Sequence, residues 1–295
     1  MLAGSPTSAL TTSLALDLER RGFIVFIITS TAEDEQHVKS HSRVDILPLT
    51  LDLVYPETAQ SQVASFGRLL SKRQLTVAGE VGHHTSLAGV ILVLDTQCEV
   101  SPVVGVSPDA WSTALNAKVL NTILTAQHLL PLVSRLHSRI LLLMPSIVSS
   151  LRPPHHAVQS TVSGALEGFA GSLASELALQ NIPFCHFRLG HLELPGNGQK
   201  SRSGSKRVRG TPMRLLYESV FDALRSRRPR RTWRVGRGSL TYDLVGGWLP
   251  TGAVGWMMGL QQDKKDMIHA DGDHLIESDG GSDSSTQWEK VEQIS

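Results

Sequence analysis

The sequence of 295 residues predicts an α/β protein built on a doubly wound parallel sheet, on the strength of three observations. Apolar, β-branched runs of strand length alternate with longer amphipathic stretches, which is the pattern of strand-helix-strand crossovers. The apolar runs lack polar alternation, as expected of strands that are buried on both faces. With 41% apolar residues, the chain can also bury a sizeable core.

The predicted elements follow one another in a regular order. A glycine turn lies four residues into the chain, in "MLAGSPTSAL", where this kind of sheet requires a full strand before the turn. We therefore expect a truncated first strand in the middle of the sheet. The elements predicted after it are a strand "FIVFII" (23–28), a helix over 56–73, a strand "AGVILVLD" (88–95), a helix over 108–136, a strand "RILLLM" (139–144), a helix over 156–177, a strand "PFCHFRL" (183–189) and a helix over 212–227.

Composition divides the rest of the chain. We predict one domain over 1–260, which includes a mobile loop rich in Gly, Ser, Lys and Arg over 196–212 and a C-terminal extension over 213–260. Residues 261–295 form an acidic tail, rich in Asp, Gly and Ser, that we expect to be largely disordered.

Cysteine usage and hydropathy indicate an intracellular protein, in the cytosol or peripherally on the cytoplasmic face of a membrane. The two cysteines, Cys98 and Cys185, are too few for a disulfide framework and lie in apolar or strand-like surroundings. No run of about 20 apolar residues is present, and the first residues lack the order of a secretory signal. We expect buried free thiols and no membrane span.

The helix sequence "ALEGFAGSLASEL" (165–177), between a loop and a strand, together with the order of elements, resembles the short-chain dehydrogenase/reductase (SDR) superfamily across Met1 to Leu194. Members of that superfamily are Rossmann-fold enzymes that use NAD or NADP. The stretch "RRPRRTWRVGRGSLTYDLVGGWLPTGAVGWMMG" (227–259) resembles the C-terminal region of its steroid and retinoid branch. More narrowly, the chain is similar to an uncharacterised fungal family derived from the superfamily, whose members carry "WEKV"-like tails.

The resemblance implies roles for several retained residues. Asn116 matches the asparagine that supports a water in the proton relay, and Ser146 matches the serine that binds the substrate carbonyl. Asp52 matches the acidic residue that faces the adenine ring. Gly4, followed by Ser5, matches the first glycine of the TGxxxGxG cofactor turn. The alternative for Asn116 and Ser146 is structural, as a helix cap or bridge and as an ordinary loop serine.

The catalytic pair of the superfamily is missing. The active-site tyrosine is expected thirteen residues after Ser146, where this chain has Gln159, and the lysine four residues further, where it has Ser163. The chemistry needs a phenol whose pKa is lowered by a nearby ammonium group, and a carboxamide has no titratable proton near neutral pH. The helix keeps only its predicted packing face, which comprises Ala165, Leu166, Phe169, Leu173 and Leu177.

The cofactor turn has changed as well. Ser8 and Leu10 replace its later glycines, and we expect Leu10 to crowd the phosphates. The residue that reads the ribose 2′ position falls near Ser30, which favours neither NAD nor NADP. "LDTQ" (94–97) and Leu189–Gly190 replace two further signatures. The cofactor, if there is one, is NAD or NADP, but these four departures predict a relaxed site.

Other features predict partners. The basic arm Lys200–Arg237 holds thirteen Lys or Arg, and the segment Trp248–Trp256 follows it, which favours an acidic membrane surface; solvated loops or a cover over the pocket are the alternatives. The tail motif Trp288–Val291 suits addition of a strand to a partner protein. Nucleic acid is not expected, because no stacking platform or reader motif is present. The adjacent histidine pairs, 83–84 and 155–156, lack the spacing of a metal site.

Two functions remain open at this point. The first is a degenerate SDR-like protein without the tyrosine-lysine pair, which serves as a binding or regulatory scaffold. The second is an NAD(P)-dependent oxidoreductase acting on a lipid-like alcohol or ketone, with Ser146, Asn116 and either His155 or His156 as the acid. The C-terminal resemblance favours a hydrophobic small molecule as ligand under both.

Overall fold

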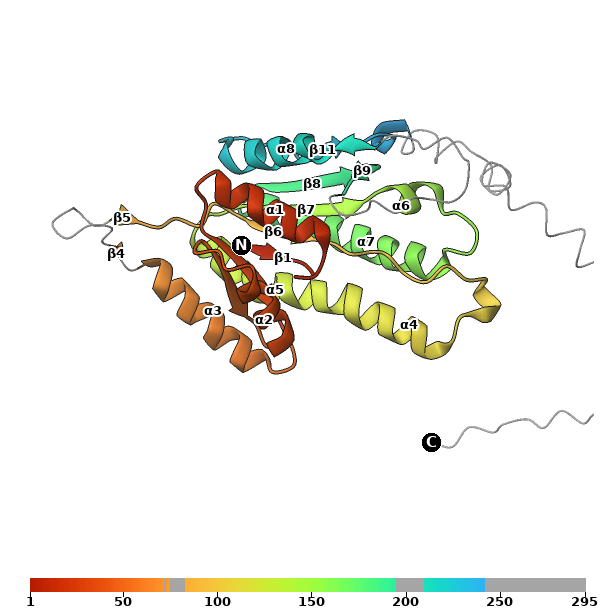
Figure 1. Cartoon of the computed structure of the whole chain (residues 1–295), viewed down its shortest axis with the longest axis horizontal. Coiled ribbons are helices and arrows are strands. Elements are labelled where there is room, and N and C mark those ends of the chain that lie inside the picture. Colours follow the sequence, from red (N-terminus) through yellow and green to blue (C-terminus); the bar gives the residue numbers. More distant parts are fainter. Residues whose placement is uncertain (72, 75–82, 195–209, 242–295) are drawn as a thin grey trace, which may run out of the picture. The chain divides into compact units, whose positions relative to one another are not determined.

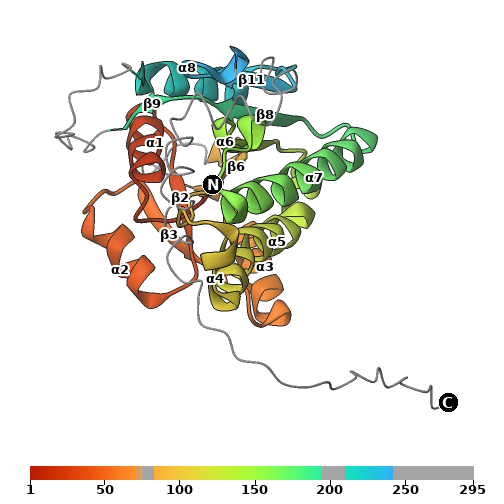
Figure 2. The ribbon, with the colours of Figure 1, turned by 90° about the vertical axis from the view of Figure 1, so that its right-hand side faces the viewer.

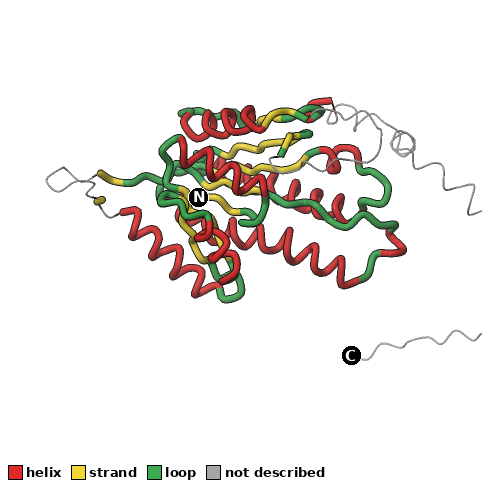
Figure 3. Tube along the Cα trace, in the orientation of Figure 1, coloured by secondary structure: helices red, strands yellow, loops and turns green. Residues whose placement is uncertain are grey.

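A seven-stranded parallel sheet forms the centre of the computed structural model (Figures 1 and 3). The structure describes residues 1–71, 73–74, 83–194 and 210–241. All of them belong to one unit, Met1–Val254, and a second unit, Gly255–Ser295, lies outside the described residues. The predicted acidic tail over 261–295 and the loop over 196–212, except for its last three residues, therefore fall outside the described part of the chain.

The strand order is β11-β8-β7-β6-β1-β2-β3. These seven strands are β1 (Leu2–Ala3), β2 (Val25–Thr29), β3 (Ile46–Thr50), β6 (Val90–Val93), β7 (Ile140–Pro145), β8 (Phe184–Leu189) and β11 (Thr232–Val235). Two short pairs lie outside the sheet: β4 (Arg73–Gln74) with β5 (His83–His84), and β9 (Leu192–Glu193) with β10 (Thr211–Pro212).

The truncated first strand is confirmed. Strand β1 has only two residues, yet it lies between β2 and β6, with Leu2 opposite Ile27 on one side and Ile91 on the other. The chain runs outward from β1 to β2 and β3 and then returns to β6 on the opposite side, so the order of strands reverses beside β1. In open α/β sheets such a switch point is where ligands bind.

Helices cover both faces of the sheet, and Figure 2 shows the two groups on opposite sides. Helices α1, α2 and α8 pack on one face, and α3, α5 and α7 pack on the other. No helix within the described ranges is long and apolar enough to cross a membrane. The helices are α1 (Ala9–Arg20), α2 (Ala32–Ser40), α3 (Pro56–Ser71), η1 (Val103–Gly105), α4 (Pro108–Ala114), η2 (Leu115–Leu120), α5 (Asn121–Arg135), α6 (Ile147–Leu151), α7 (Ala157–Leu179) and α8 (Met213–Arg225).

The central strands explain why the apolar runs show no polar alternation. Along β7, Ile140 and Leu142 enter the core under α3, α5 and α7, whereas Leu141 and Leu143 enter the core under α1, α2 and α8. Successive strand residues point to opposite faces, so a strand covered on both sides needs apolar residues throughout. The doubly wound α/β fold expected from the sequence is therefore confirmed.

Helix α7 buries a face that partly differs from the predicted one. Leu166, Leu173 and Leu177 are buried as expected, but Ala165 is exposed and Phe169 is only partly buried. The helix buries Val158, Val162, Ser163 and Ala170 instead. The predicted stripe was centred slightly off the true one, because small residues such as Ala165 are compatible with either side of a helix.

Candidate functional site

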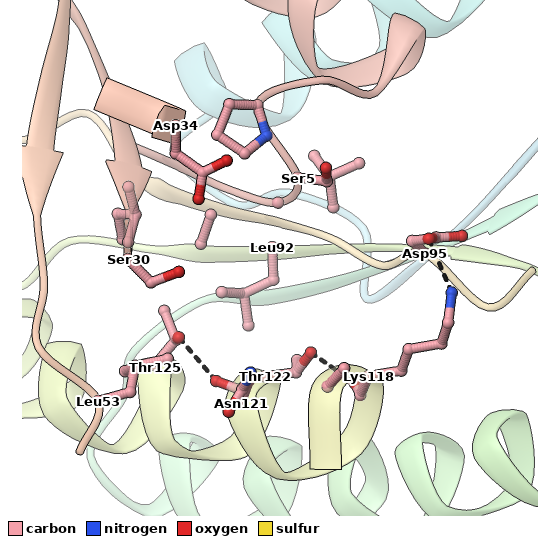
Figure 4. A pocket seen from close by; sticks show the side chains of 16 residues that line it. Ser5, Ser30, Asp34, Leu53, Leu92, Asp95, Lys118, Asn121, Thr122 and Thr125 are labelled. Carbon is pink, nitrogen blue, oxygen red and sulfur yellow. Dashed lines mark hydrogen bonds and ion pairs between the residues drawn. The ribbon is translucent and has the colours of Figure 1, made fainter. Parts of the chain in front are cut away.

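A cleft of about 340 Å³ opens at the carboxyl ends of β1, β2 and β6, at the switch point of the sheet (Figure 4). Ser5 follows β1, Ser30 follows β2 and Asp95 follows β6, so three loops converge there. Lys118 on η2 and Asn121 on α5 line the opposite wall. The arrangement combines charged, hydroxyl and amide groups above an apolar base, as small-molecule sites do.

Gly4 allows the turn after β1 to lie close to β6. A Cβ atom at this position would stand 2.8 Å from Cβ and 2.9 Å from the carbonyl oxygen of Val93. Only glycine fits such an approach without a shift of the backbone. Gly4 and Ser5 both line the cleft, in the place that the resemblance to the cofactor turn implied.

The two replaced glycines lie elsewhere. The backbone N–H of Ser8 donates to the carbonyl of Ser5 at 3.1 Å, and Ser8 is the N-cap of α1. The Leu10 side chain packs against the core under α1 and α8. The described residues that line the cleft do not include Leu10, so its expected crowding of phosphates in the cleft is not supported.

Asp52 is not among the described residues that line the cleft; its carboxylate stabilises the turn before α3. Its Oδ1 atom accepts hydrogen bonds from the backbone N–H groups of Val54 at 2.9 Å and Tyr55 at 3.1 Å, directly before α3 begins. The acidic residue that does line the cleft beside Ser30 is Asp34, on the first turn of α2. Sequence analysis missed Asp34, although its position three residues after the N-cap Thr31 marked it as part of a helix start.

The described lining of the cleft includes Lys118 and does not include Asn116. The Asn116 side chain is exposed, and its Nδ2 donates to Ser112 Oγ at 3.3 Å. The segment Leu115–Leu120 is a π-helical turn inside the long helix, so side chains after its start are rotated relative to a regular α-helix. Lys118 therefore reaches the cleft, where its Nζ lies 2.8 Å from Asp95 Oδ2 (Figure 4).

The Lys118–Asp95 pair closes one end of the cleft. The Lys118 side chain is 21% exposed and that of Asp95 is 51% exposed. The carbonyl oxygen of Lys118 accepts a hydrogen bond from Thr122 Oγ1 at 2.7 Å, which secures the π turn. A second cavity, of about 480 Å³, shares Ala117 and Lys118 with the cleft and includes Cys98. Lys118 thus stands in the wall between two cavities.

Ser146 and Ser163, which the resemblance assigns to catalytic positions, are buried, and Gln159 is partly buried. Ser146 is 2% exposed, and its Oγ donates to the carbonyl oxygen of Leu189 at 3.1 Å. Ser163 is fully buried, and its hydroxyl has no hydrogen-bond partner within the described part of the chain. Gln159 lies one turn before it on α7, partly buried. The described lining of the cleft contains neither Ser146 nor Gln159 nor Ser163.

The histidines of the alternative hypothesis lie beside α7. His155 adopts a positive φ of 65°, and its carbonyl accepts the Ser101 N–H at 3.0 Å. A ring nitrogen of His156, Nδ1, lies 2.9 Å from the carbonyl oxygen of Pro154. Among the residues that the structure describes, no group of three or more His, Cys, Asp and Glu could hold a metal ion.

Comparison with solved structures defines the class of fold. A short-chain dehydrogenase from Streptomyces avermitilis superposes with a TM-score of 0.61 at 13% identity, over 92% of this chain and 98% of that one. A short-chain dehydrogenase from Burkholderia cenocepacia, in complex with NADP, gives 0.57 at 15% identity, over 91% and 94%. A short chain oxidoreductase from Pseudomonas aeruginosa PAO1, NADPH-bound and containing an atypical catalytic center, gives 0.51 at 16%, over 65% and 71%. The chain therefore has the SDR-type Rossmann fold.

Sequence comparison then gives the family. A fungal family of unknown function, DUF1776, matches residues 1–207 and 197–255, and the chain belongs to it. UPF0744 protein C106.03 of Schizosaccharomyces pombe is 26% identical over 258 residues, which cover 87% of this chain and 68% of that protein. The expected membership of an SDR-derived fungal family is confirmed.

Two of these neighbours are bound to NADP or NADPH. Of the described residues that line the cleft, Asp34 and Asp95 are acidic and Lys118 alone is basic, so the described lining carries a net charge of −1. A pyrophosphate adds two negative charges, which this lining repels. The Ser8 N–H, which an open turn would offer to a phosphate, is bonded to Ser5. The described lining therefore offers a pyrophosphate a single basic side chain, Lys118, which is paired with Asp95.

Proposed function

We propose that this protein is a pseudoenzyme of the SDR type: a binding or regulatory scaffold that holds a small ligand in the cleft beside β1 and performs no classical hydride transfer. The observation that carries the proposal is the state of Gln159 and Ser163. They stand where the resemblance places the tyrosine and the lysine, and the Ser163 hydroxyl is enclosed in the core.

The chemistry supports the same conclusion. Loss of a positioned general acid or base costs on the order of 10² to 10⁴ in rate, and neither Gln nor Ser titrates near neutral pH. The Ser146 hydroxyl donates its hydrogen bond to the carbonyl oxygen of Leu189, so it has no second hydrogen to donate to a substrate carbonyl. Lys118 is paired with Asp95 in the cleft, whose described lining does not include Ser146, Gln159 or Ser163.

The test is reduction of carbonyl compounds by the purified full chain. We expect no consumption of NADH or NADPH above the protein-free rate with a panel of aldehydes and ketones, including lipid-like ones. Calorimetry should show no saturable binding of NAD, NADH, NADP or NADPH up to millimolar concentration. A carbonyl reductase of established activity, assayed on the same panel, is the positive control. Robust NADPH-dependent reduction by the unchanged protein would refute the proposal.

An oxidoreductase is the second candidate function, because the Pseudomonas neighbour is an oxidoreductase with an atypical catalytic center. Under it, His155 or His156 supplies the acid for a lipid-like alcohol or ketone. Neither histidine is among the described residues that line the cleft or the neighbouring 480 Å³ cavity. Any activity that survives replacement of both histidines by alanine excludes this version and directs attention to Lys118.

We also propose that the basic region docks on an anionic membrane surface. In its described part, exposed arginines cluster where α8 ends and β11 begins: Arg225, Arg227, Arg228, Arg230 and Arg231. Clustered arginine near a surface attracts acidic lipid head groups. Residues 200–209, Trp248–Trp256 and the protein-binding motif Trp288–Val291 lie outside the described residues, so their parts in partner binding stay predictions.

Flotation with vesicles tests this surface. We expect the full chain to float with vesicles of phosphatidylcholine and phosphatidylserine, and to stay at the bottom with vesicles of phosphatidylcholine alone. Replacing Arg227 and Arg228 by Glu should reduce flotation, whereas Arg20→Glu on α1 should not. Equal flotation with both lipid compositions contradicts an electrostatic surface.

A further inference from the structure

A pocket of about 410 Å³ lies between the end of α8 and the start of β11, two elements that lie next to each other in Figure 1. It lies at the amino ends of the parallel strands, whereas the cleft beside β1 lies at their carboxyl ends. Three arginines and one aspartate give its described lining a net charge of +2, opposite in sign to that of the cleft. An anion is therefore attracted to this pocket. The lining residues are Asp222, Arg225, Ser226, Arg228, Pro229, Arg230 and Trp233.

We propose that this arginine pocket binds the head group of a polyphosphorylated inositol lipid. The inference rests on the anionic membrane surface proposed above and specifies which lipid is recognised there. The phosphate groups accept hydrogen bonds from Arg225, Arg228 and Arg230, and a free hydroxyl of the inositol ring donates to Asp222. Arg227 and Arg231 are exposed but are not among the described lining residues, so they add only general attraction to the membrane.

The three arginines of the pocket are available to a ligand. They are exposed, and no acidic side chain in the described part of the chain forms an ion pair with them, whereas Arg214 on the same helix is paired with Glu218 at 2.7 Å. A guanidinium group presents its N–H donors in a planar fork that matches a phosphate. A phosphate monoester carries close to two negative charges near neutral pH. Three arginines in one pocket therefore favour a ligand with several phosphates over one with a single charge.

Hydrogen bonds hold the backbone that carries these arginines. Arg139, directly before β7, donates from Nη1 to the carbonyl oxygens of Ala223 at 2.7 Å and Ser226 at 2.6 Å. At the other end of the segment, Trp233 Nε1 donates to the carbonyl oxygen of Arg230 at 2.9 Å. The segment between α8 and β11 is thus fixed to the sheet at both ends, so less conformational entropy is lost when a ligand binds.

The chemistry of the lining discriminates among anionic lipids. A phosphatidylserine head group carries an ammonium group besides its phosphate and carboxylate, and a lining of net positive charge repels that ammonium group. An inositol head group carries no cation, and its ring hydroxyls are donors for which the Asp222 carboxylate is an acceptor. The pocket volume lies within the range of about 300 to 1,000 Å³ of small-molecule sites, which suits one head group.

Flotation of the full chain at matched surface charge tests the lipid preference. The vesicles are phosphatidylcholine with either phosphatidylinositol bisphosphate or enough phosphatidylserine to give the same surface charge. We expect at least about tenfold tighter binding to the bisphosphate vesicles, because charge-assisted bonds to the pocket arginines are added. The soluble head group, inositol trisphosphate, should compete with these vesicles for the protein.

Two double variants that remove the same charge separate the pocket from general attraction. Arg225→Gln/Arg228→Gln should abolish the preference for the bisphosphate. The matched control, Arg227→Gln/Arg231→Gln, should weaken binding to both kinds of vesicle and leave the preference unchanged. Asp222→Asn removes the acidic group of the pocket and keeps an acceptor, so it should strengthen binding to the bisphosphate about threefold, the scale of an exposed charge pair. A gain of affinity cannot come from misfolding.

Equal binding to the two charge-matched vesicles overturns the proposal, as does a preference that persists in Arg225→Gln/Arg228→Gln. Inositol trisphosphate that binds the protein while bisphosphate vesicles do not excludes a membrane lipid and also overturns it. Polyglutamate that competes as well as inositol trisphosphate overturns it in favour of an acidic protein partner. Flotation without a lipid preference refutes this inference alone, whereas no flotation with either anionic vesicle refutes the membrane surface itself, so the two failures are distinguishable.

Discussion

The cleft beside β1 and the α6–α7 region are both built at carboxyl ends of sheet strands, but their polar side chains are used differently. In the cleft, Asp34, Lys118 and Asp95 line open space. In the α6–α7 region, the Ser146 hydroxyl is bonded to a carbonyl group and the Ser163 hydroxyl is enclosed. The comparison shows that one sheet edge can hold both a cavity lined by polar groups and a region whose hydroxyl groups are enclosed by packing on the apolar face of α7.

The largest effect should come from the packing face of α7. Leu166 is 1% exposed in the core, so Leu166→Ala should lower the free energy of unfolding by about 2–5 kcal/mol through lost contacts and a cavity. Gln159→Ala, on the same helix, should change it by less than about 0.5 kcal/mol. Urea denaturation measures both. A large loss with Gln159→Ala would show that the Gln159 side chain has a structural role.

The turn that shapes the cleft should come next. Gly4→Ala places a Cβ within 2.8 Å of Val93, and we expect a loss of about 1–3 kcal/mol in stability. Gly168→Ala on α7 is the control, since a Cβ there meets no atom within 4 Å and alanine favours a helix by about 0.5–1 kcal/mol. Thermal melts should move in opposite directions. A neutral Gly4→Ala would mean that β1 and β6 separate easily.

A smaller effect distinguishes the two buried serines. Ser163→Ala removes a buried hydroxyl without a partner among the described residues and should raise stability by about 1 kcal/mol. Ser146→Ala removes a hydrogen bond to Leu189 and should lower stability by about the same amount. Denaturant midpoints measure the difference. If Ser163→Ala is as destabilising as Ser146→Ala, the Ser163 hydroxyl has a partner beyond the described residues.

The smallest effect concerns the thiols. Burial raises the pKa of Cys185 to about 11 and also raises that of the half-buried Cys98 beside Lys118. At pH 8, iodoacetamide should modify Cys98 in the wall of the 480 Å³ cavity faster than Cys185 in the core. The raised pKa makes the contribution of Cys185 to stability complete below pH 9, and that contribution is lost as the pH rises towards 11. Cys185→Ala should flatten this part of the pH profile; an unchanged slope would assign it to other groups.

The sequence predicted the central strands better than the edges of the sheet. Continuous apolar runs marked β2, β6, β7 and β8, which are covered on both faces. The two edge strands, β3 and β11, were not predicted, since an edge tolerates Pro48 in one and polar residues such as Arg234 in the other. A continuous apolar run indicates a buried strand, and the two edge strands are only partly buried.

The candidate site was predicted less completely. Gly4, Ser5 and Ser30, which the resemblance assigned to cofactor binding, line the cleft, whereas the described lining does not include Asp52, Leu10 or Asn116. The position of Lys118 in the lining was not predicted, because it lies in a π turn, which shifts side chains and leaves no clear mark in the sequence. Asp34 and Lys118 both line the cleft because of the order of the strands, which is a property of the sheet topology.

The short central strand also has a mechanical consequence. Among the described strands, β1 alone joins the pair β2–β3 to the block β6–β7–β8–β11, and it pairs with β2 only through Leu2, so the sheet has a seam beside β1. The cleft lies at the end of this seam, with Ser30 on one block and Asp95 on the other. A molecule that contacts both Ser30 and Asp95 would restrict the separation of the two blocks. Its binding should therefore reduce local opening at the seam. We expect amide hydrogen exchange to slow more in β2 than in β7.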